Sequence, residues 1–394
     1  MNSEYPNVAT DVGTQRRLRS SAGRRSLSRM VTFVALVQSI LSLAHWFVYQ
    51  TWSFFIPRAA TPDANALRLA LGLLSVSFIT ASLLAHRYDN SLVRAYYTIA
   101  AVWLGTLNFL FLGAISCWIF YVAALLLRVH LNLPVLAAVI LGATALASIY
   151  GLLNARRIRV KRIAVNLPGL PPSWRGRIAA HVTDTHLGHV NGAAFLRRIV
   201  AMLRQYQPDI VFVTGDMYDG TRADVAALAA PWLDLAPPFG AYFVTGNHEE
   251  FSDPKKYLDA IRGAGVSVLA NDKVVVDGLQ VVGVYYHDTV NSARLRSILQ
   301  RALLDRERAS IFLSHAPYGL AIADELGVSL QLSGHTHGGQ LFPFTWFTRR
   351  VFGEYTYGLK RFRDLLVYTS TGAGTWGPPM RIGTSPEIVL IEFA

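Results

Sequence analysis

Cysteine is nearly absent from this 394-residue chain: it contains one, Cys117, inside a long apolar stretch. A single cysteine excludes an intrachain disulfide framework and a metal site built from several thiolates. Acidic residues are scarce in the first part of the chain. Residues 1–162 hold 16 Lys and Arg against 4 Asp and Glu, whereas residues 163–394 hold 21 of each. The net charge of +12 therefore belongs to the N-terminal part, which argues against a basic nucleic-acid-binding enzyme domain and predicts no nucleic-acid partner.

The N-terminal part is dominated by four long apolar stretches, at about residues 30–56, 67–85, 95–127 and 134–154. Each is near or above the roughly 20 residues with which a helix crosses a bilayer. The third stretch is longer than a ~30 Å apolar core requires, so it must tilt, protrude or bend. Its polar residues and those of the other stretches include no paired carboxylates, which favours helix–helix hydrogen bonding over an ion path. We therefore predict a four-helix transmembrane anchor over residues 30–155.

Basic residues flank these stretches unevenly. Residues 1–29, predicted to be a disordered basic tail, carry six arginines, and a second basic group at 156–162 follows the fourth stretch. With the tail, the second loop and this group on one side, about 13 Lys and Arg lie there against about 3 on the other. The positive-inside rule then places both ends of the chain in the cytosol. A fifth span within 95–127 would move the following domain to the other side.

From about residue 157 the pattern changes to short apolar runs separated by amphipathic segments. An opening strand is expected near 158–167, where apolar and basic residues alternate. Five further strands are expected at 178–182, 210–213, 241–244, 311–313 and 330–332, with helices at 192–206, 222–233, 254–263, 292–304 and 317–326. This alternation predicts an α/β domain over residues 156–394.

Carboxylate, amide and imidazole side chains follow each of the five predicted strands. The blocks are Asp184-Thr185-His186, Gly215-Asp216-Met217-Tyr218-Asp219, Gly246-Asn247-His248-Glu249, Ser314-His315 and Ser333-Gly334-His335-Thr336-His337. Taken singly, each block has a structural explanation, such as a helix cap or a turn. Together they place at least seven nitrogen and oxygen donors at strand ends, where open α/β sheets gather their sites. Imidazole and carboxylate donors in this number predict a metal centre.

This ordered set of blocks resembles the calcineurin-like metallophosphoesterase superfamily, over roughly residues 160–394. The segment 372–387 is similar to that of the membrane-associated, YkuE-type branch, some members of which hydrolyse UDP-2,3-diacylglucosamine in lipid A synthesis. The resemblance implies a two-sheet β-sandwich flanked by helices, here preceded by the all-α transmembrane region. It also implies a bacterial inner-membrane protein, with its N-terminus and its catalytic domain in the cytoplasm by the charge distribution above.

The resemblance further assigns roles to residues of this chain. The residues that would hold two divalent metal ions are Asp184, His186 and His337 at the first ion, Asn247, His315 and His335 at the second, and Asp216 between them. His248 would face the substrate instead of binding metal, and Asp219 would orient it. No ligand position departs from the family pattern, which argues against a degenerate, non-catalytic relative.

The expected chemistry follows from this donor set. Carboxylate, amide and imidazole ligands without thiolates suit Mn, Fe, Zn, Ni or Co and do not choose among them. Two such ions clamp phosphoryl oxygens and lower the pKa of a bound water, and His248 is the group left to protonate the leaving oxygen. We therefore expect hydrolysis of a phosphoester or pyrophosphate, with a lipid-linked substrate such as UDP-2,3-diacylglucosamine as the leading hypothesis.

Aromatic and basic residues interleave across residues 342–363, after the last histidine block. One interpretation is a long hairpin whose rings pack on the sandwich. The other is a membrane-facing lip, in which the rings enter the interface and the arginines meet anionic headgroups. Arg349 and Arg381 are candidate substrate-binding residues, although Arg381 is also explained as a structural tie. Asp288 either supports the metal ligands or terminates a strand, and structural roles are favoured for His181 and His189.

Two alternative functions stay open. The first is a membrane-tethered phosphodiesterase or phosphatase of soluble nucleotides or phosphoproteins. The second is a transporter or receptor with a structural metal domain, against which the complete donor set and the spans without paired charges argue. The sequence does not predict an oligomeric state.

Overall fold

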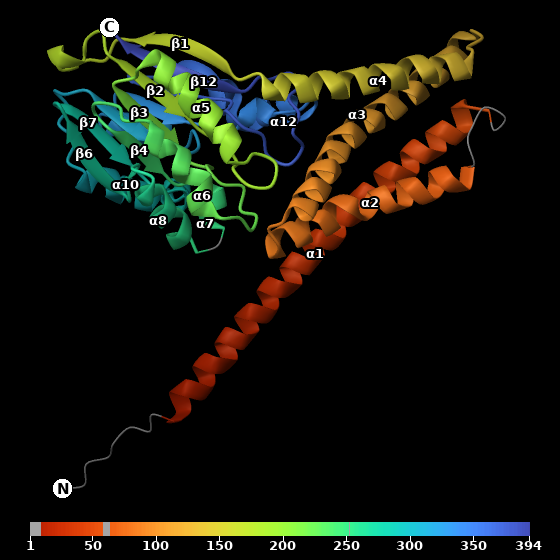
Figure 1. The fold of residues 1–394 in the computed structure, drawn as a ribbon, viewed down its shortest axis with the longest axis horizontal. Helices are drawn as coiled ribbons and strands as arrows, with labels where there is room; N and C mark the ends of the chain where they lie inside the picture. The colour runs from red at the N-terminus through yellow and green to blue at the C-terminus, as the bar shows by residue number, and fades with distance from the viewer. Residues whose placement is uncertain (1–8, 58–63, 252) are drawn as a thin grey trace. The chain divides into compact units, whose positions relative to one another are not determined.

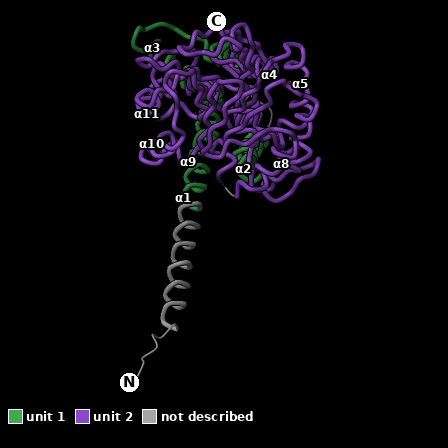
Figure 2. The backbone as a smooth tube through the Cα atoms, turned by 90° about the vertical axis from the view of Figure 1, so that its left-hand side faces the viewer, with its two compact units in different colours: residues 1–80, 110–141 green, residues 81–109, 142–394 purple. Residues whose placement is uncertain are grey.

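The computed structural model describes residues 9–57, 64–251 and 253–394, with side-chain detail from Val31 onward. The chain divides into two compact units, residues 1–80 with 110–141 and residues 81–109 with 142–394 (Figure 2). The first unit is helical. The second unit contains both sheets together with part of the third long helix and part of the fourth, so these helix ends belong to the same unit as the predicted metal centre.

Four long helices form the N-terminal part of the chain (Figure 1): α1 Ala9–Phe55, α2 Ala64–Arg87, α3 Ser91–Leu127 and α4 Leu133–Arg156. Each contains a segment long and apolar enough to cross a membrane. The predicted four-helix region is thereby confirmed, and the long third stretch is one helix of 37 residues. Helix α1 begins at Ala9, so residues 9–29 of the predicted disordered tail lie within its bounds; residues 1–8 lie outside the described part.

Two six-stranded sheets form the body of the second unit. The first has the strand order β1-β12-β2-β3-β4-β5 and the second β10-β11-β9-β8-β7-β6. The first sheet contains β1 Arg159–Val165, β12 Glu387–Phe393, β2 Ile178–Val182, β3 Ile210–Thr214, β4 Ala241–Val244 and β5 Ser267–Val268. The second contains β10 Gly358–Phe362, β11 Leu365–Thr369, β9 Leu330–Ser333, β8 Ser310–Leu313, β7 Leu279–Gly283 and β6 Asp272–Val276. All five strands predicted to precede the polar blocks are present.

The two sheets share one apolar core, because strands of both contribute to the same buried cluster. Phe212 and Val389 of the first sheet and Ile311 and Leu332 of the second belong to it, together with the buried Trp174 from the turn η2 Pro172–Trp174. Side chains alternate between the faces of a strand, so the opposite face of each sheet needs its own cover.

Helices cover the outer face of each sheet. Against the first sheet pack α5 Ala193–Tyr206, α6 Val225–Ala229, η3 Ala230–Asp234 and α8 Lys255–Gly263. Against the second pack α10 Ser292–Arg301 and α11 Leu320–Glu325. In α5 the apolar stripe at Leu196, Ile199, Val200 and Leu203 is buried, as its helical spacing requires. The predicted two-sheet sandwich flanked by helices is therefore confirmed.

The segment 342–363 differs from the predicted long hairpin. Helix α12 Phe344–Phe352 and the turn η5 Gly353–Thr356 occupy its first half, and only β10 continues into a hairpin with β11. Helix α12 buries none of its residues. The prediction failed because apolar residues at 344, 347 and 351 form one face of a helix, whereas the rings at 342, 344 and 346 alternate as in a strand. Two remaining short helices, α7 Asn247–Glu250 and α9 Tyr286–Val290, and the turn η4 His337–Gly339 lie in the loops that follow strands.

Candidate metal centre

The five polar blocks come together because the strands that precede them run in register. In the first sheet β2, β3 and β4 are parallel, and in the second β8 and β9 are parallel. Parallel neighbours end at the same edge of a sheet, so the loops after them meet there. The donors on these loops are Asp184 and His186 after β2, Asp216 after β3, Asn247 after β4, His315 after β8, and His335 and His337 after β9.

The first group of donors combines Asp184, His186 and His337. The Nε2 atoms of His186 and His337 lie 3.0 Å apart. Asp184 Oδ1 is 3.4 Å from His337 Nε2 and 3.9 Å from His186 Nε2. One donor atom of each residue thus lies within 4.8 Å of the other two. All three side chains are buried, and they are the three residues expected to share one ion.

The second group is centred on His315. Its Nε2 lies 3.2 Å from Asp216 Oδ2, 3.2 Å from Asn247 Oδ1 and 3.2 Å from His335 Nδ1. Asp216 Oδ2 is also 3.9 Å from His186 Nε2, in the first group. Asp216 therefore lies between the two groups, in the place where a bridging carboxylate would stand.

The charges within the centre are strongly coupled. Burial raises the pKa of Asp184 to about 6, and Asp216 adds to the rise. Burial alone would lower the pKa of His315, but the neighbouring Asp216 outweighs it and raises that pKa to about 10. For Asp216, burial opposes ionisation, yet His315, His248 and His186 hold its pKa below the usual range. A proton on His315 thus balances Asp216 in the metal-free protein, and a cation bound there would replace that proton.

Backbone strain concentrates at the donor residues. A positive φ between 46° and 68° occurs at five of the seven, Asp184, His186, Asp216, His335 and His337. The left-handed region is unfavourable for residues other than glycine and persists where the surrounding structure imposes it, often at functional sites. The loops after β2, β3 and β9 therefore turn sharply, and these turns direct the donor side chains into the common volume.

Glycine is required where two of these turns touch. A Cβ atom at Gly246 would lie 2.1 Å from Asp216 Oδ1, so no larger residue fits beside the central carboxylate. Glu249, in the same block as Gly246, has no predicted role. Its carboxylate is buried and accepts hydrogen bonds from the main-chain N–H groups of Gly246, Asp216 and Tyr218 at 2.8, 3.0 and 3.0 Å. It holds the loop that carries Asp216. Glu249 directly follows His248 in a block of donors, and this position is the sequence feature that could have indicated its role.

His248 is held at the margin of both groups. Its main-chain N–H donates to Asp216 Oδ1 at 2.9 Å, and its Nε2 lies 3.9 Å from Asp216 Oδ2. Its Nδ1 lies 3.1 Å from the main-chain carbonyl oxygen of Asp219. The contact with Asp219 is therefore made by the backbone, whereas the Asp219 carboxylate lies 3.8 Å from His186 Nδ1. Burial, with Asp216 nearby, raises the pKa of the Asp219 carboxyl to about 8.

Arg381 and Arg349, the two candidate substrate-binding residues, occupy different places. Arg381 is fully buried, and its guanidinium donates to the main-chain carbonyls of His337, Thr371 and Gly374. It also lies 3.1 Å from His337 Nδ1. Burial lowers the pKa of Arg381 to about 10. This arrangement fixes the loop and ring of a metal donor. Arg349 is exposed on α12, outside both donor groups.

Asp288, His181 and His189 lie outside the donor groups. His181 Nε2 is 2.8 Å from Thr214 Oγ1, and His189 Nε2 is 3.1 Å from the Tyr88 carbonyl. The Asp288 carboxylate accepts hydrogen bonds from Asn271 and Arg294. Each of the three has a protein partner that accounts for its position.

The chemistry of the donor set fits two divalent cations. In each group, two imidazole nitrogens face each other at hydrogen-bond distance, 3.0 Å for His186 and His337 and 3.2 Å for His315 and His335. Such buried pairs are satisfied by a shared proton or by a cation between them and the adjacent carboxylates. The His186 Nδ1 atom also lacks a hydrogen-bond partner. The described residues provide one such group on each side of Asp216, which matches a dinuclear centre.

Comparisons with known proteins agree with this geometry. The family described as calcineurin-like phosphoesterase matches residues 179–339. The chain is 32% identical over 266 residues to an uncharacterized metallophosphoesterase of Aquifex aeolicus, a match that covers 65% of this chain and 97% of that protein. It is 26% identical over 238 residues to the uncharacterized metallophosphoesterase YkuE of Bacillus subtilis, covering 57% of this chain and 81% of that protein.

A vertebrate relative has a similar description. The chain is 32% identical over 267 residues to a "Transmembrane protein with metallophosphoesterase domain" of Danio rerio, a match that covers 63% of this chain. It spans 60% of that relative's length. The predicted family is confirmed by these matches together with the fold and the two donor groups: the chain belongs to the calcineurin-like metallophosphoesterases, a family dependent on a dinuclear metal centre.

Proposed function

We propose that this protein is a membrane-anchored hydrolase of phosphoesters or pyrophosphates that uses two divalent metal ions. The observation that carries the proposal is the position of Asp216, whose carboxylate lies within 4 Å of donors from both groups. When bound, the two ions would neutralise the phosphoryl oxygens and supply a hydroxide nucleophile. One ion would be held by Asp184, His186 and His337, and the other by Asn247, His315 and His335. Asp216 would hold both ions.

His248 is the residue of this site proposed to move a proton. Its Nδ1–H can donate to the Asp219 carbonyl, which leaves Nε2 directed toward the donor groups. In the imidazolium form Nε2 carries the proton that a departing alkoxide or phosphate oxygen needs. Phe251 and Trp376 lie beside the ring, with centroids 5.0 and 6.3 Å away. They flank the imidazole of His248, which is buried.

A lipid-linked substrate is the narrower proposal, and contacts within the second unit support it. Asn154 of α4 donates to the carbonyls of Arg381 and Thr384, both at 2.9 Å. Asn108 of α3 donates to the Phe342 carbonyl at 3.0 Å. Arg381 in turn holds the loop of the donor His337. Segments of two candidate membrane helices are thus tied to the loops that build the site, which is the arrangement expected when the substrate is presented from the lipid phase.

The first experiment measures metal and turnover together in the purified full-length protein. With Mn²⁺ added, we expect hydrolysis of bis-p-nitrophenyl phosphate, loss of activity on chelation and recovery on readdition of the metal. His335→Ala should lose both bound metal and activity, because it removes a donor. Wild-type protein that binds metal but shows no turnover with any of Mn, Fe, Zn, Ni or Co would favour the transporter or receptor alternative, and protein that binds no metal would contradict the proposal.

The substrate class needs a separate comparison. In mixed micelles, we expect a lipid-linked pyrophosphate such as UDP-2,3-diacylglucosamine to be hydrolysed with a higher kcat/KM than soluble nucleotides or phosphopeptides. The C-terminal resemblance described above is the reason for choosing that lipid first. Higher kcat/KM for the soluble substrates would favour the membrane-tethered phosphodiesterase or phosphatase instead.

We also propose on which side of the membrane the catalytic domain lies. The excess of Lys and Arg in the tail, the second loop and residues 156–162 supports a cytoplasmic catalytic domain at a bacterial inner membrane. A reporter that is active only in the cytoplasm, fused after Ala394, is expected to be active. Activity of an export-dependent reporter at the same position would reverse the assignment.

A further inference from the structure

A second polar pocket lies in the catalytic unit, apart from the two donor groups. Its volume is about 1090 Å³, and its wall is formed by the start of β1, helix α12, η5, β10 and the loop before β12. That volume is slightly above the usual range of small-molecule sites, about 300–1,000 Å³. The pocket is therefore large enough for a phosphorylated headgroup.

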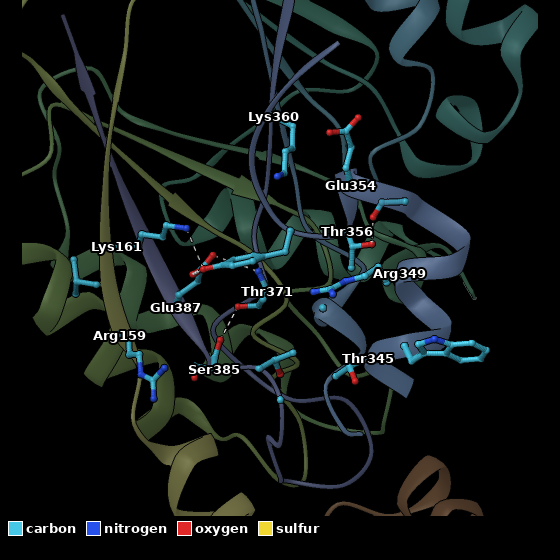
Figure 3. Close-up of a pocket in the computed structure, with 17 residues that line it drawn as sticks. Arg159, Lys161, Thr345, Arg349, Glu354, Thr356, Lys360, Thr371, Ser385 and Glu387 are labelled. Carbon is cyan, nitrogen blue, oxygen red and sulfur yellow. Dashed lines mark hydrogen bonds between the residues drawn. The ribbon is translucent and has the colours of Figure 1, made fainter. Parts of the chain in front are cut away.

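Four cationic side chains line this pocket: Arg159, Lys161, Arg349 and Lys360. Figure 3 shows Lys161, Lys360 and Arg349 on different sides of the pocket, each directed toward its interior. None of the four has a carboxylate within 4 Å among the residues that the structure describes. Their charge is therefore available to a ligand.

Two carboxylates also line the pocket, and they differ in environment. Glu387 is buried and accepts hydrogen bonds from the hydroxyls of Tyr357, Tyr368 and Ser370. Its oxygens are thus occupied by neutral donors, and it does not form an ion pair with Lys161. Glu354 is exposed. Four cations against these two acids leave the pocket with a positive balance.

Lys161 is held in position without being neutralised. Its Nζ donates to the Tyr357 hydroxyl at 3.1 Å and lies 4.5 Å from the centre of the Tyr357 ring. An ammonium group placed over an aromatic face keeps its full charge and loses little freedom on binding an anion. The pocket is therefore preorganised on its β1 side.

The surroundings of the pocket connect it with both the membrane helices and the metal centre. Helix α4 ends at Arg156, three residues before Arg159. Trp346 lines the pocket from α12, and Phe344, Trp346, Phe347 and Val351 of this helix are 53%, 51%, 52% and 74% exposed. Gly338 lines it directly after the metal donor His337, and a Cβ there would lie 2.9 Å from Thr384. The pocket and the metal centre thus use adjacent residues of one loop.

We propose that this pocket is a binding site for a phosphate-bearing anion, separate from the dinuclear centre. Lys161, Lys360 and Arg349 contact the phosphoryl oxygens, since an arginine fork and two ammonium groups match that charge and geometry. The ligand is either the headgroup of an anionic phospholipid, whose acyl chains would lie along the apolar face of α12, or a soluble phosphate compound. The inference does not depend on the reaction carried out at the metal centre.

The test measures binding by calorimetry to the full-length, metal-loaded protein in a zwitterionic detergent. The probes are inorganic phosphate, glycerol 3-phosphate, dihexanoyl phosphatidylglycerol and dihexanoyl phosphatidylcholine. Lys360→Gln and Arg349→Gln are expected to weaken anion binding at least tenfold. Arg361→Gln is the matched control, because Arg361 is the exposed neighbour of Lys360 on β10 and does not line the pocket. It should change binding less than twofold.

The four probes distinguish the source of the phosphate. Binding of phosphatidylglycerol alone identifies a lipid headgroup, and binding of inorganic phosphate or glycerol 3-phosphate identifies a soluble ligand. Lys360→Arg should restore binding, which excludes a loss through misfolding. The proposal is overturned if no anion binds, if phosphatidylcholine binds as tightly as phosphatidylglycerol, or if Lys360→Gln and Arg361→Gln have equal affinity. Because hydrolysis is not measured, failure here leaves the proposed function unaffected.

Discussion

The helical region and the catalytic region place apolar side chains in opposite ways. In helices α1 to α4, large hydrophobic residues such as Leu36, Leu73 and Leu126 are exposed. In the two-sheet region such residues are buried between the sheets and under the helices, while aspartates and histidines are buried at the strand ends. The first pattern requires an apolar solvent, and the second requires water outside and a ligand for the buried charge.

One segment of the catalytic region exposes its apolar side chains, as the helical region does. Among the described residues from 156 onward, half of the exposed large hydrophobics lie between Phe342 and Tyr357. This segment includes α12 and borders the basic pocket. We therefore propose three environments for the chain: lipid for the spans, a buried charged site for the metal centre, and an interface for α12. Substitutions at the metal centre, at a buried histidine outside it and on α12 test the buried sites and the interface, from the largest expected effect to the smallest.

The largest effect is expected at His248, the buried group proposed to transfer a proton. His248→Ala should lower kcat by about 10²–10⁴-fold while metal content stays unchanged, because general acid catalysis contributes that much. Metal analysis and steady-state kinetics on the same preparation give both numbers. Unchanged turnover would remove His248 from the mechanism. His287→Ala, at a histidine that is 65% exposed in its side chain, serves as the control and should retain activity.

An intermediate effect is expected at His181, which is buried without a proposed role in the chemistry. Burial lowers its pKa to about 3, below the ordinary value of 6.5. Between these values the unfolded chain binds a proton that the folded protein does not. The contribution of neutral His181 to the free energy of unfolding is therefore complete above pH 6.5. It is lost as the pH falls below 6.5, by about 1.4 kcal/mol per pH unit.

His181→Gln should remove this dependence. Chemical denaturation between pH 6.5 and 5.5 should show the wild-type protein losing about 1 kcal/mol more than the variant. His130→Gln, at an exposed histidine between α3 and α4, should keep the wild-type slope. Equal slopes for His181→Gln and the wild type would mean that His181 becomes protonated in the folded state.

The smallest effect is expected at the apolar face of α12. The double substitution Phe344→Ser and Trp346→Ser should raise KM for a micellar lipid substrate by roughly three- to tenfold, since it removes apolar surface from the interface. Turnover of bis-p-nitrophenyl phosphate should not change. Val275→Ser, which removes an exposed apolar side chain from β6, provides the comparison. If the α12 substitutions leave KM unchanged, the apolar face of α12 lies in water and not at a membrane interface.

Much of the architecture could be predicted because it depends on local patterns. Span length and composition predicted four membrane helices, and apolar runs followed by donors predicted the strand ends. The segment 342–363 was the exception, since its ring spacing fits a helix or a strand and only packing decides. The role of Glu249 was also missed, because its three main-chain partners come from two separate loops.

What the sequence alone determined is the set of donors and their order along the chain, because apolar periodicity and residue chemistry are local properties. What only the tertiary structure decided is their mutual geometry: Asp216 between the two groups, the backbone contact from Asp219 to His248, and Arg381 buried against His337. The basic pocket belongs to the same class, since Lys161 and Lys360 lie about 200 residues apart and meet only when β1 and β10 are placed by the two sheets. Such long-range contacts depend on packing and burial, which no short stretch of sequence specifies.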